Sequence, residues 1–228
     1  LYEAGFPTTC EIAIGDNLLI YPWIKTLVRM NKAFTVRRSL KAKEMMESSI
    51  LMSRYMHYAI TEKKENIWIA QREGRAKDSS DHTQDSVLKM LAYGGEGTIV
   101  ERLKELNIVP LTISYEYDPC DYLKAQEFQQ KRDNPEWKKA PQDDLINMKT
   151  GMFGYKGNIH YHIADCINEE IDKIDRSLGK NEKTAAVARI IDKHIHSNYK
   201  FWPINYYFYE LMTGDTQSLF NHTLFPAL

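Results

Sequence analysis

Several features that assign a chain to a specialised class of protein are scarce or missing here. Three cysteines, Cys10, Cys120 and Cys166, are spread over 228 residues; an odd, widely spaced set argues against a disulfide framework and favours a reducing compartment. No apolar run approaches the ~20 residues of a membrane span, and no signal peptide is visible. The formal net charge of −1 argues against general nucleic-acid binding, so any cationic character must be local. Nucleotide loops of the Gly-x-Gly-x-x-Gly or Walker type are also missing.

What is present describes an ordinary globular protein. The chain is 43% hydrophobic and 27% charged, and its 228 residues are enough for one domain with a sizeable core and an appendage. It starts at Leu1 rather than at a methionine, and we expect it to be part of a longer protein. We place an α/β domain, truncated at its N-terminus, at residues 1–178 and a helical and aromatic extension at residues 179–228.

Strand and helix signals alternate along most of the chain. Runs with the composition or alternation typical of strands cover residues 9–15, 33–36, 67–70, 108–115 and 158–163. The run at 108–115 is largely apolar, as in a parallel strand that is buried on both faces. Helical patterns separate the runs, which predicts crossover connections that are right-handed by strong precedent. The predicted fold class is therefore α/β, with a mainly parallel sheet flanked by helices, a helical excursion at residues 122–148 and a helical and aromatic C-terminal extension.

Helical periodicity gives more specific expectations. Residues recur at steps of three and four over 41–61, which predicts a long amphipathic helix with one buried face. That face consists of Met45, Ser49, Met52, Met56 and Ile60. Thr98 and Glu101 have the spacing of a capping box and predict the start of another helix. A further helix is expected to be capped within residues 78–81 and to end at Gly94.

Isolated histidines and cysteines are assigned structural or surface roles. We place His57 and His82 on the surface and Cys166 in the core as a structural cysteine. His194 and His196 stand two apart on a predicted helix and cannot share a face, which argues against a metal site. The sequence therefore gives no metal-ligating set.

Two strand-like runs end in clusters of basic residues. Residues 67–78 run Ile-Trp-Ile-Ala-Gln-Arg-Glu-Gly-Arg-Ala-Lys-Asp, so a β-branched run passes directly into a cationic glycine turn. Earlier in the chain, residues 34–38 (Phe-Thr-Val-Arg-Arg) have the same pattern, a short strand-like run that ends in two arginines. A strand that runs into such a turn is a common way for an α/β protein to present a phosphate site. We therefore predict one pocket for an anionic ligand, assembled from both loops.

Three segments, taken in order, resemble the glycerol-phosphate and lysophospholipid acyltransferase family. Residues 33–39 are similar to that family's second block, a strand that ends in an arginine, and residues 15–19 fit its lead-in. Residues 72–75, Arg-Glu-Gly-Arg, resemble the third block, Glu-Gly-x-Arg or Glu-Gly-Gly-Arg. Residues 108–116 look like the fourth block, a strand with an early proline. The likeness covers residues 10–165 and rests on the order and spacing of the segments.

The resemblance implies that the second and third blocks bind the phosphate of an acyl acceptor. Arg38 aligns best with the arginine of the second block, and Arg37 is the alternative. Glu73 and Gly74 correspond directly to the third block. The implied phosphate-binding residues thus begin with a basic strand end and continue in a glycine turn.

The next position of the third block departs from the family pattern. The family's arginine stands two places after the glycine, where this chain has Ala76. Arg75 would serve after a one-residue deletion, or Lys77 would reach the phosphate from the other side. Arginine binds phosphate through a planar fork, whereas lysine acts as a point charge. The full implied set is Arg37, Arg38, Glu73, Gly74, Arg75 and Lys77.

The resemblance also implies a reaction and its partners. A fatty acyl group would move from the thioester of acyl-CoA or acyl carrier protein to a hydroxyl of glycerol phosphate or a lysophospholipid. No bound cofactor, metal or nucleic acid takes part. Because the acceptor is a lipid or a lipid precursor, a cytoplasmic protein with peripheral contact to the cytoplasmic face of a membrane is implied.

The catalytic pair of that family has no counterpart in this chain. It is a His-x4-Asp motif N-terminal to the second block, in which the histidine acts as general base and the aspartate orients it. The eight residues before Thr9 contain no histidine. His160 and Asp165 have the same spacing but follow the fourth block, and we take this as a coincidence. We therefore expect the chain alone to bind the acceptor without turning it over.

Other interpretations remain open from the sequence. A non-catalytic phosphate- or lipid-binding module fits the missing base. An unrelated phosphotransfer or hydrolase enzyme with Glu73 as its base would instead depend on a metal or a nucleotide. Glu73 can equally form an exposed ion pair with Arg72 or Arg75, worth about 0–1 kcal/mol. The aromatic residues at 199–209 either close over the core or lie at a membrane interface.

Overall fold

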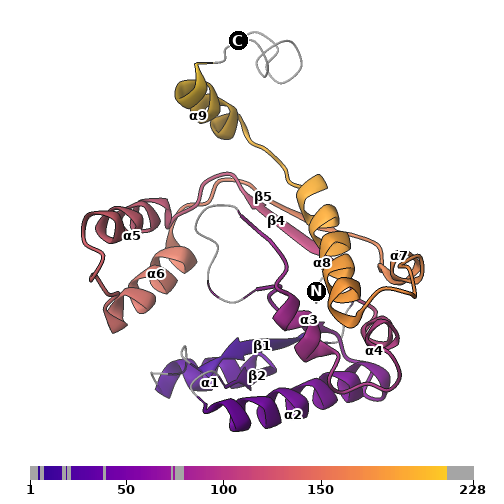
Figure 1. Cartoon of the computed structure of the whole chain (residues 1–228). Coiled ribbons are helices and arrows are strands. Elements are labelled where there is room, and N and C mark those ends of the chain that lie inside the picture. The colour runs from indigo at the N-terminus through magenta and orange to yellow at the C-terminus, as the bar shows by residue number, and fades with distance from the viewer. Residues whose placement is uncertain are drawn as a thin grey trace. The chain divides into compact units, whose positions relative to one another are not determined.

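The computed structural model describes residues 5, 8–16, 19, 22–37, 40–72, 74 and 80–214 (Figure 1). The chain forms two compact units. The first comprises Leu1–Arg75, Asp81–Pro110 and Ala164–His194, and the second comprises Ala76–Ser80, Leu111–Ile163 and Ile195–Leu228. The boundary that the sequence suggests between residues 178 and 179 stays a prediction.

Helices and strands alternate in the first unit, whereas the second unit is mostly helical. The elements of the first unit are β1 (Glu11–Gly15), α1 (Pro22–Met30), β2 (Ala33–Val36), α2 (Ala42–Thr61), β3 (Ile67–Trp68), α3 (Asp85–Leu91), α4 (Ile99–Glu105), α7 (Asn168–Asp172) and α8 (Lys180–Ser197), whose last turn passes into the second unit. Those of the second unit are β4 (Leu111–Tyr115), α5 (Asp121–Asp133), α6 (Pro141–Phe153), β5 (Ile159–Ile163) and α9 (Pro203–Thr213).

The first unit contains a three-stranded parallel sheet in the order β2-β1-β3. On one side of β1, Gly15 pairs with Val36, and on the other side Ile12 pairs with Trp68. Helix α1 connects β1 to β2 and begins at Pro22, whose fixed φ and missing N–H suit the first turn of a helix. Helix α2 connects β2 to β3. The predicted α/β class, with a parallel sheet flanked by helices, is confirmed for this unit.

Helix α2 packs along the sheet, as Figure 1 shows. The ring of Tyr55 meets the ring of Phe34 on β2 edge to face, with 5.4 Å between centroids, and its hydroxyl donates a hydrogen bond to Glu11 on β1. The predicted helix over residues 41–61 is confirmed almost to the residue. One helix thus joins two strands of the sheet through a single aromatic side chain.

The buried face of α2 differs from the predicted one. Met56 is buried as expected, but Met45 is 43% exposed, and the other buried residues of the helix are Ser53, His57 and Ala59. The surface position predicted for His57 is wrong, because this side chain is only 5% exposed. The polar residues are buried because the end of α3 offers them backbone hydrogen-bond partners, a tertiary contact that hydrophobic spacing does not report.

Helices α2, α3, α4, α7 and α8 surround the core of the first unit. Its largest fully buried apolar side chains are Met56, Leu88, Leu103, Ile167, Ile171 and Val187. The predicted capping box of α4 is confirmed: the Thr98 hydroxyl accepts from Glu101 N, and the Glu101 carboxylate accepts from Thr98 N at 2.6 Å. The cap predicted for α3 within residues 78–81 is wrong, because that helix begins after Gln84.

The second unit contains a two-stranded antiparallel ribbon, β4–β5, in which Leu111 pairs with Ile163 and Tyr115 with Ile159. The parallel strand predicted at residues 108–115 is therefore wrong in direction. The reason is the helical excursion, predicted at 122–148 and present as α5 and α6, which returns the chain antiparallel to β4. One face of β4 is also polar, not apolar, since Thr112 and Ser114 are buried and hydrogen-bonded to backbone groups.

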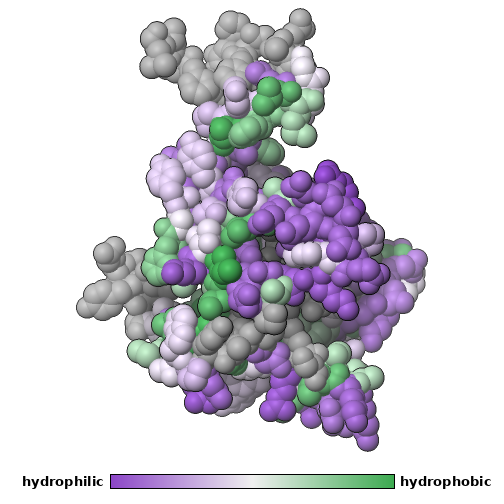
Figure 2. Space-filling model, turned by 90° about the vertical axis from the view of Figure 1, so that its left-hand side faces the viewer, coloured by the Kyte–Doolittle hydropathy of each residue, from purple (hydrophilic) through white to green (hydrophobic). Residues whose placement is uncertain are grey.

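Helix α9 exposes a surface that is rich in aromatic residues. None of its residues, all of which the structure describes, is buried. Its exposed large side chains are Tyr207, Phe208, Tyr209, Leu211 and Met212, and hydrophobic green patches mark this helix near the top of Figure 2. Among the described residues, no helix has both the length and the apolar character needed to cross a bilayer.

Candidate anion-binding site

The carboxyl ends of the three parallel strands point to one edge of the sheet. β1 ends at Gly15, which pairs with Val36 at the end of β2, and Arg37 follows directly. β3 runs in the same direction but covers only Ile67–Trp68, which pair with Glu11 and Ile12 at the start of β1. Because β1 lies between them, β2 and β3 are two strand spacings, roughly 10 Å, apart. Arg37 thus stands at the edge where α/β proteins bind ligands, and the loop with Arg72 and Gly74 follows β3 after a short segment that is not a strand.

The loop with the Glu-Gly-Arg sequence is held together at its base. Gln84 N donates a hydrogen bond of 3.0 Å to the carbonyl of Gln71. Nη2 of Arg72 lies 3.8 Å from Oδ1 of Asp81, an ion pair that bridges the two ends of the loop. These contacts fix the position of the chain on both sides of the loop, after β3 and before α3.

A second anchor follows directly after the loop. The backbone N–H and the hydroxyl of Thr83 both donate to Oδ1 of Asp192 on α8, at 2.7 and 2.6 Å. Nδ1 of His82 lies 3.5 Å from the other oxygen of the same carboxylate. His82 itself is 71% exposed in its side chain, which agrees with the surface position predicted for it. The loop is therefore attached to α8 as well as to the sheet.

Two described residues of the loop have features that suit an anion. Gly74 has φ of 81°, a left-handed conformation that favours glycine, and a Cβ built there would meet no atom within 4 Å. Arg72 is half-buried, and its Nη2 has no hydrogen-bond partner among the described residues although it is removed from solvent. The Asp81 carboxylate, at 3.8 Å, is too distant for a hydrogen bond, so among the described residues this nitrogen keeps a donor that a ligand oxygen can accept from.

The structure places some of the predicted phosphate-binding residues and not others. Arg37 is exposed at the end of β2, and Gly74 is exposed in the loop. The remaining four lie outside the described residues: Arg38, Glu73, Arg75 and Lys77. Arg72 was not among the predicted residues, and the only sequence signal for it is its place directly before the Glu-Gly pair.

Comparisons with family models, with curated proteins and with solved structures found no match for this chain. Any function for this edge of the sheet must therefore be inferred from the residues themselves and from their placement.

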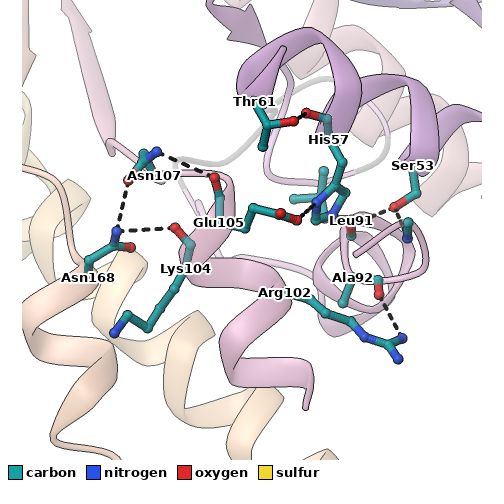
Figure 3. A network of polar contacts seen from close by, with 11 residues as sticks. Ser53, His57, Thr61, Leu91, Ala92, Arg102, Lys104, Glu105, Asn107 and Asn168 are labelled. Atoms are coloured by element: carbon teal, nitrogen blue, oxygen red, sulfur yellow. Dashed lines mark hydrogen bonds and ion pairs between the residues drawn. The ribbon is translucent and has the colours of Figure 1, made fainter. Parts of the chain in front are cut away.

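His57 is the most deeply buried histidine of the described part, and its contacts decide whether it can act as a general base. Figure 3 shows its ring between α2, the end of α3 and α4. Nδ1 is hydrogen-bonded to the Glu105 carboxylate, and Nε2 donates to the carbonyl of Leu91 at 3.0 Å. Both ring nitrogens are therefore engaged inside the protein, and neither can accept a proton from a substrate hydroxyl.

The rest of this network completes the C-terminus of α3. The hydroxyl of Ser53 donates to Leu91 O at 2.6 Å and accepts from Gly94 N at 2.7 Å, and Nη1 of Arg102 donates to Ala92 O at 3.2 Å (Figure 3). The last carbonyls of a helix have no hydrogen-bond partner within the helix, and these side chains supply the missing partners. The network is structural: it joins α2, α3 and α4.

Where the structure describes them, the remaining candidate side chains do not form a catalytic group. Cys166, predicted in the core, is exposed, so that prediction is wrong; it lies in the turn before α7, outside the packed helices. Nε2 of His194 hydrogen-bonds to Glu170, and this bond lowers the pKa of the Glu170 carboxyl. Within the described residues, no group of three or more His, Cys, Asp and Glu side chains is placed to hold a metal ion.

Proposed function

We propose that this chain is the acceptor-binding part of an acyltransferase. The enzyme moves a fatty acyl group from a CoA or carrier-protein thioester to a hydroxyl of glycerol phosphate or a lysophospholipid. The observation that supports this most is that Arg37 directly follows β2 at the carboxyl edge of the parallel sheet, while Arg72 and Gly74 lie in the anchored loop that follows β3. A phosphate held between these two segments would meet positive charge from both.

Each residue has a distinct part in holding the acceptor. Arg37, or Arg38 by the family resemblance, binds phosphate oxygens from the end of β2. Gly74 leaves its surroundings open, so a ligand can approach the backbone. Arg72 supplies a second guanidinium, and a planar fork gives two parallel hydrogen bonds to a phosphate. Arg75 or Lys77 adds a further positive charge.

The general base of the reaction is not assigned to a described residue. In the resembling family it is a histidine that precedes the second block, and His57 is engaged at both ring nitrogens. The proposal therefore gives this chain acceptor binding. The groove for the acyl chain would contribute about 0.8 kcal/mol for each methylene that it buries.

The decisive experiment measures acyl transfer from acyl-CoA and from acyl carrier protein to glycerol-3-phosphate and to lysophosphatidic acid. The protein expressed from its complete gene is compared with the 228-residue chain. We expect transfer by the former, and a KM for the acceptor that rises at least tenfold in Arg37→Ala or Arg38→Ala. Arg29→Ala, an exposed arginine on α1, is the matched control and should leave KM unchanged.

The second candidate is a non-catalytic module that binds phosphate lipids, favoured by the engagement of His57 in a structural network. It predicts no transfer by either protein, together with lysophosphatidic acid binding that Arg38→Ala abolishes. No transfer and no binding would remove both proposals. A thermal shift with Mg²⁺ and ATP would then point to the phosphotransfer or hydrolase alternative with Glu73 as base.

A further inference from the structure

A second concentration of positive charge lies in the first unit, away from the strand ends. A cavity of about 310 Å³ is formed by α3, the turn after it, α4 and the first turn of α8. This volume is at the lower end of the range of small-molecule sites. Four lining side chains are cations: Lys89, Arg102, Lys180 and Lys183. Among the described residues that line the cavity, none is acidic.

Two of the cations occupy a position that is electrostatically unfavourable. Lys180 and Lys183 lie in the first turn of α8, an 18-residue helix whose dipole is positive at this end. Lysines are favoured at the opposite end of a helix. Here the charges of the two lysines add to the positive end of the helix dipole. An anion in the cavity would relieve this repulsion, and would itself be favoured by the helix end.

The hydrogen bonds of Lys183 and Arg102 go to uncharged groups. Nζ of Lys183 donates to Arg176 O at 2.7 Å, and Nη1 of Arg102 donates to Ala92 O at 3.2 Å. Both acceptors are neutral carbonyls. Nε of Arg102 is buried and has no hydrogen-bond partner among the described residues, and Figure 3 shows this guanidinium turned toward Ala92 and away from His57.

The nearby carboxylates are occupied in local capping contacts. Glu101 accepts from Thr98 N at 2.6 Å, and this backbone hydrogen bond lowers the pKa of the Glu101 carboxyl. Glu182 accepts from Gly179 N at 2.7 Å. Both acids are thus bound to backbone N–H groups at the starts of their helices. Asp175, whose carboxylate interacts with the charge of Lys183, accepts from Ser177 N at 2.8 Å, and none of these three acids lines the cavity.

We propose that this cavity binds a small molecule with two or more phosphate charges. The lysines supply point charges from two helices, and Arg102 supplies directional donors from a third. Tyr93 and Ile99 give the wall an aromatic ring and an aliphatic surface, against which a non-phosphate part of a ligand can pack. Inorganic pyrophosphate, a nucleoside diphosphate and CoA share this chemistry. The inference goes beyond the proposed function and does not depend on it.

Calorimetric titration of the whole chain with pyrophosphate, ADP and CoA tests the proposal. We expect binding that weakens as salt is raised, and a Kd for the tightest probe that rises at least tenfold in the double variant Lys180→Gln, Lys183→Gln. Lys89→Gln, on a different helix, should weaken binding in the same direction. The matched control is Lys193→Gln, also on α8 but outside the cavity lining, which should change Kd less than twofold.

The three probes distinguish the sources of the phosphate chemistry. Equal affinity for pyrophosphate and ADP would support a site that holds phosphates alone, and tighter binding of ADP or CoA would support contact with Tyr93 and Ile99. The proposal is overturned if no probe binds, if the lysine variants bind as the parent chain does, or if Arg37→Ala abolishes binding instead. Melting temperatures of the variants establish that they remain folded.

Discussion

The ammonium group of Lys63, just beyond α2, lies 2.6 Å from Oε1 of Glu11, which is 5% exposed at the start of β1. The hydroxyl of Tyr55 donates to Oε2 of the same carboxylate at 2.5 Å, and the Lys63 ammonium also lies 5.4 Å from the Tyr55 ring centroid. This cluster ties α2 to the central strand at the amino end of the sheet, where Glu11 pairs with Ile67 of β3, and opposite the edge where Arg37 follows β2.

The Glu11 cluster predicts how stability depends on pH. Burial alone would raise the pKa of the Glu11 carboxyl, but hydrogen bonds from Lys63 and Tyr55 outweigh burial, so the pKa is lowered. A carboxyl with a lowered pKa in the folded state stabilises the protein above its unfolded pKa of about 4.3. That contribution is lost as the pH falls through the lower, folded value. Glu11→Gln should therefore destabilise the chain by about 1–3 kcal/mol at pH 7.

Urea unfolding midpoints measured from pH 7 down to pH 3 check this prediction. The parent chain should lose stability on acidification, and Glu11→Gln should lose less over the same range, because the ionisable group is gone. Glu62→Gln, an exposed residue directly after α2, is the control and should follow the parent curve. Parallel curves for the parent and Glu11→Gln would contradict the account.

A second prediction concerns His57 in the network that joins α2, α3 and α4. His57→Ala removes the donor to Leu91 O and the partner of Glu105, and it leaves a cavity under α2. We expect a loss of at least about 2 kcal/mol in the free energy of unfolding. His82→Ala, at an exposed position, should change it by less than about 0.5 kcal/mol. Chemical denaturation of both variants provides the comparison, and equal effects would contradict a structural role for His57.

A third prediction concerns the turn after α3, where Gly94 lies directly against α2. A Cβ at this position would be 2.5 Å from the backbone nitrogen of Arg54 and from the backbone carbon of Ser53. Gly94→Ala therefore cannot be accommodated by a side-chain movement, and we expect destabilisation of about 1–3 kcal/mol.

Gly151→Ala is the matched control for Gly94→Ala. It lies within α6, and its Cβ would meet only Cys120 Sγ, at the ordinary distance of 3.6 Å. Alanine is the better helix former, so this variant should be neutral or more stable by about 0.5–1 kcal/mol. Thermal melts of the two variants measure the difference. Melting of Gly94→Ala at the parent temperature would show that α2 and the turn are not in close contact.

A fourth prediction separates binding from stability at the loop after β3. Arg72→Met removes a partly buried guanidinium whose Nη2 has no hydrogen-bond partner among the described residues. The melting temperature should change little, because loss of the 3.8 Å ion pair with Asp81 is offset by removal of a buried nitrogen without a hydrogen bond. The affinity for lysophosphatidic acid should fall about tenfold, equivalent to about 1.4 kcal/mol. A lower melting temperature with unchanged affinity would make Arg72 structural; Arg29→Met controls for the loss of one arginine.

Local patterns determined much of the first unit. The helix over residues 41–61 and the strand at 33–36 are where the sequence predicts them. Helical periodicity and β-branched composition are both properties of a single segment, so they can be recognised without knowing which other segments it contacts. The capping box at Thr98 is also local, since both of its hydrogen bonds span three residues. The order of strands and helices then favours parallel crossovers, and β1 to β3 follow that rule.

Long-range contacts decided what the patterns do not contain. The strand at 108–115 has the composition of a parallel strand, but its direction depends on where the excursion through α5 and α6 returns the chain. His57 looks like a surface histidine until α3 ends against α2 and presents Leu91 O to it. The sequence by itself determined the elements and the basic strand ends. Only the tertiary structure brought Arg72 to Asp81 and gathered four cations around one cavity, because such contacts join residues that have no local relationship.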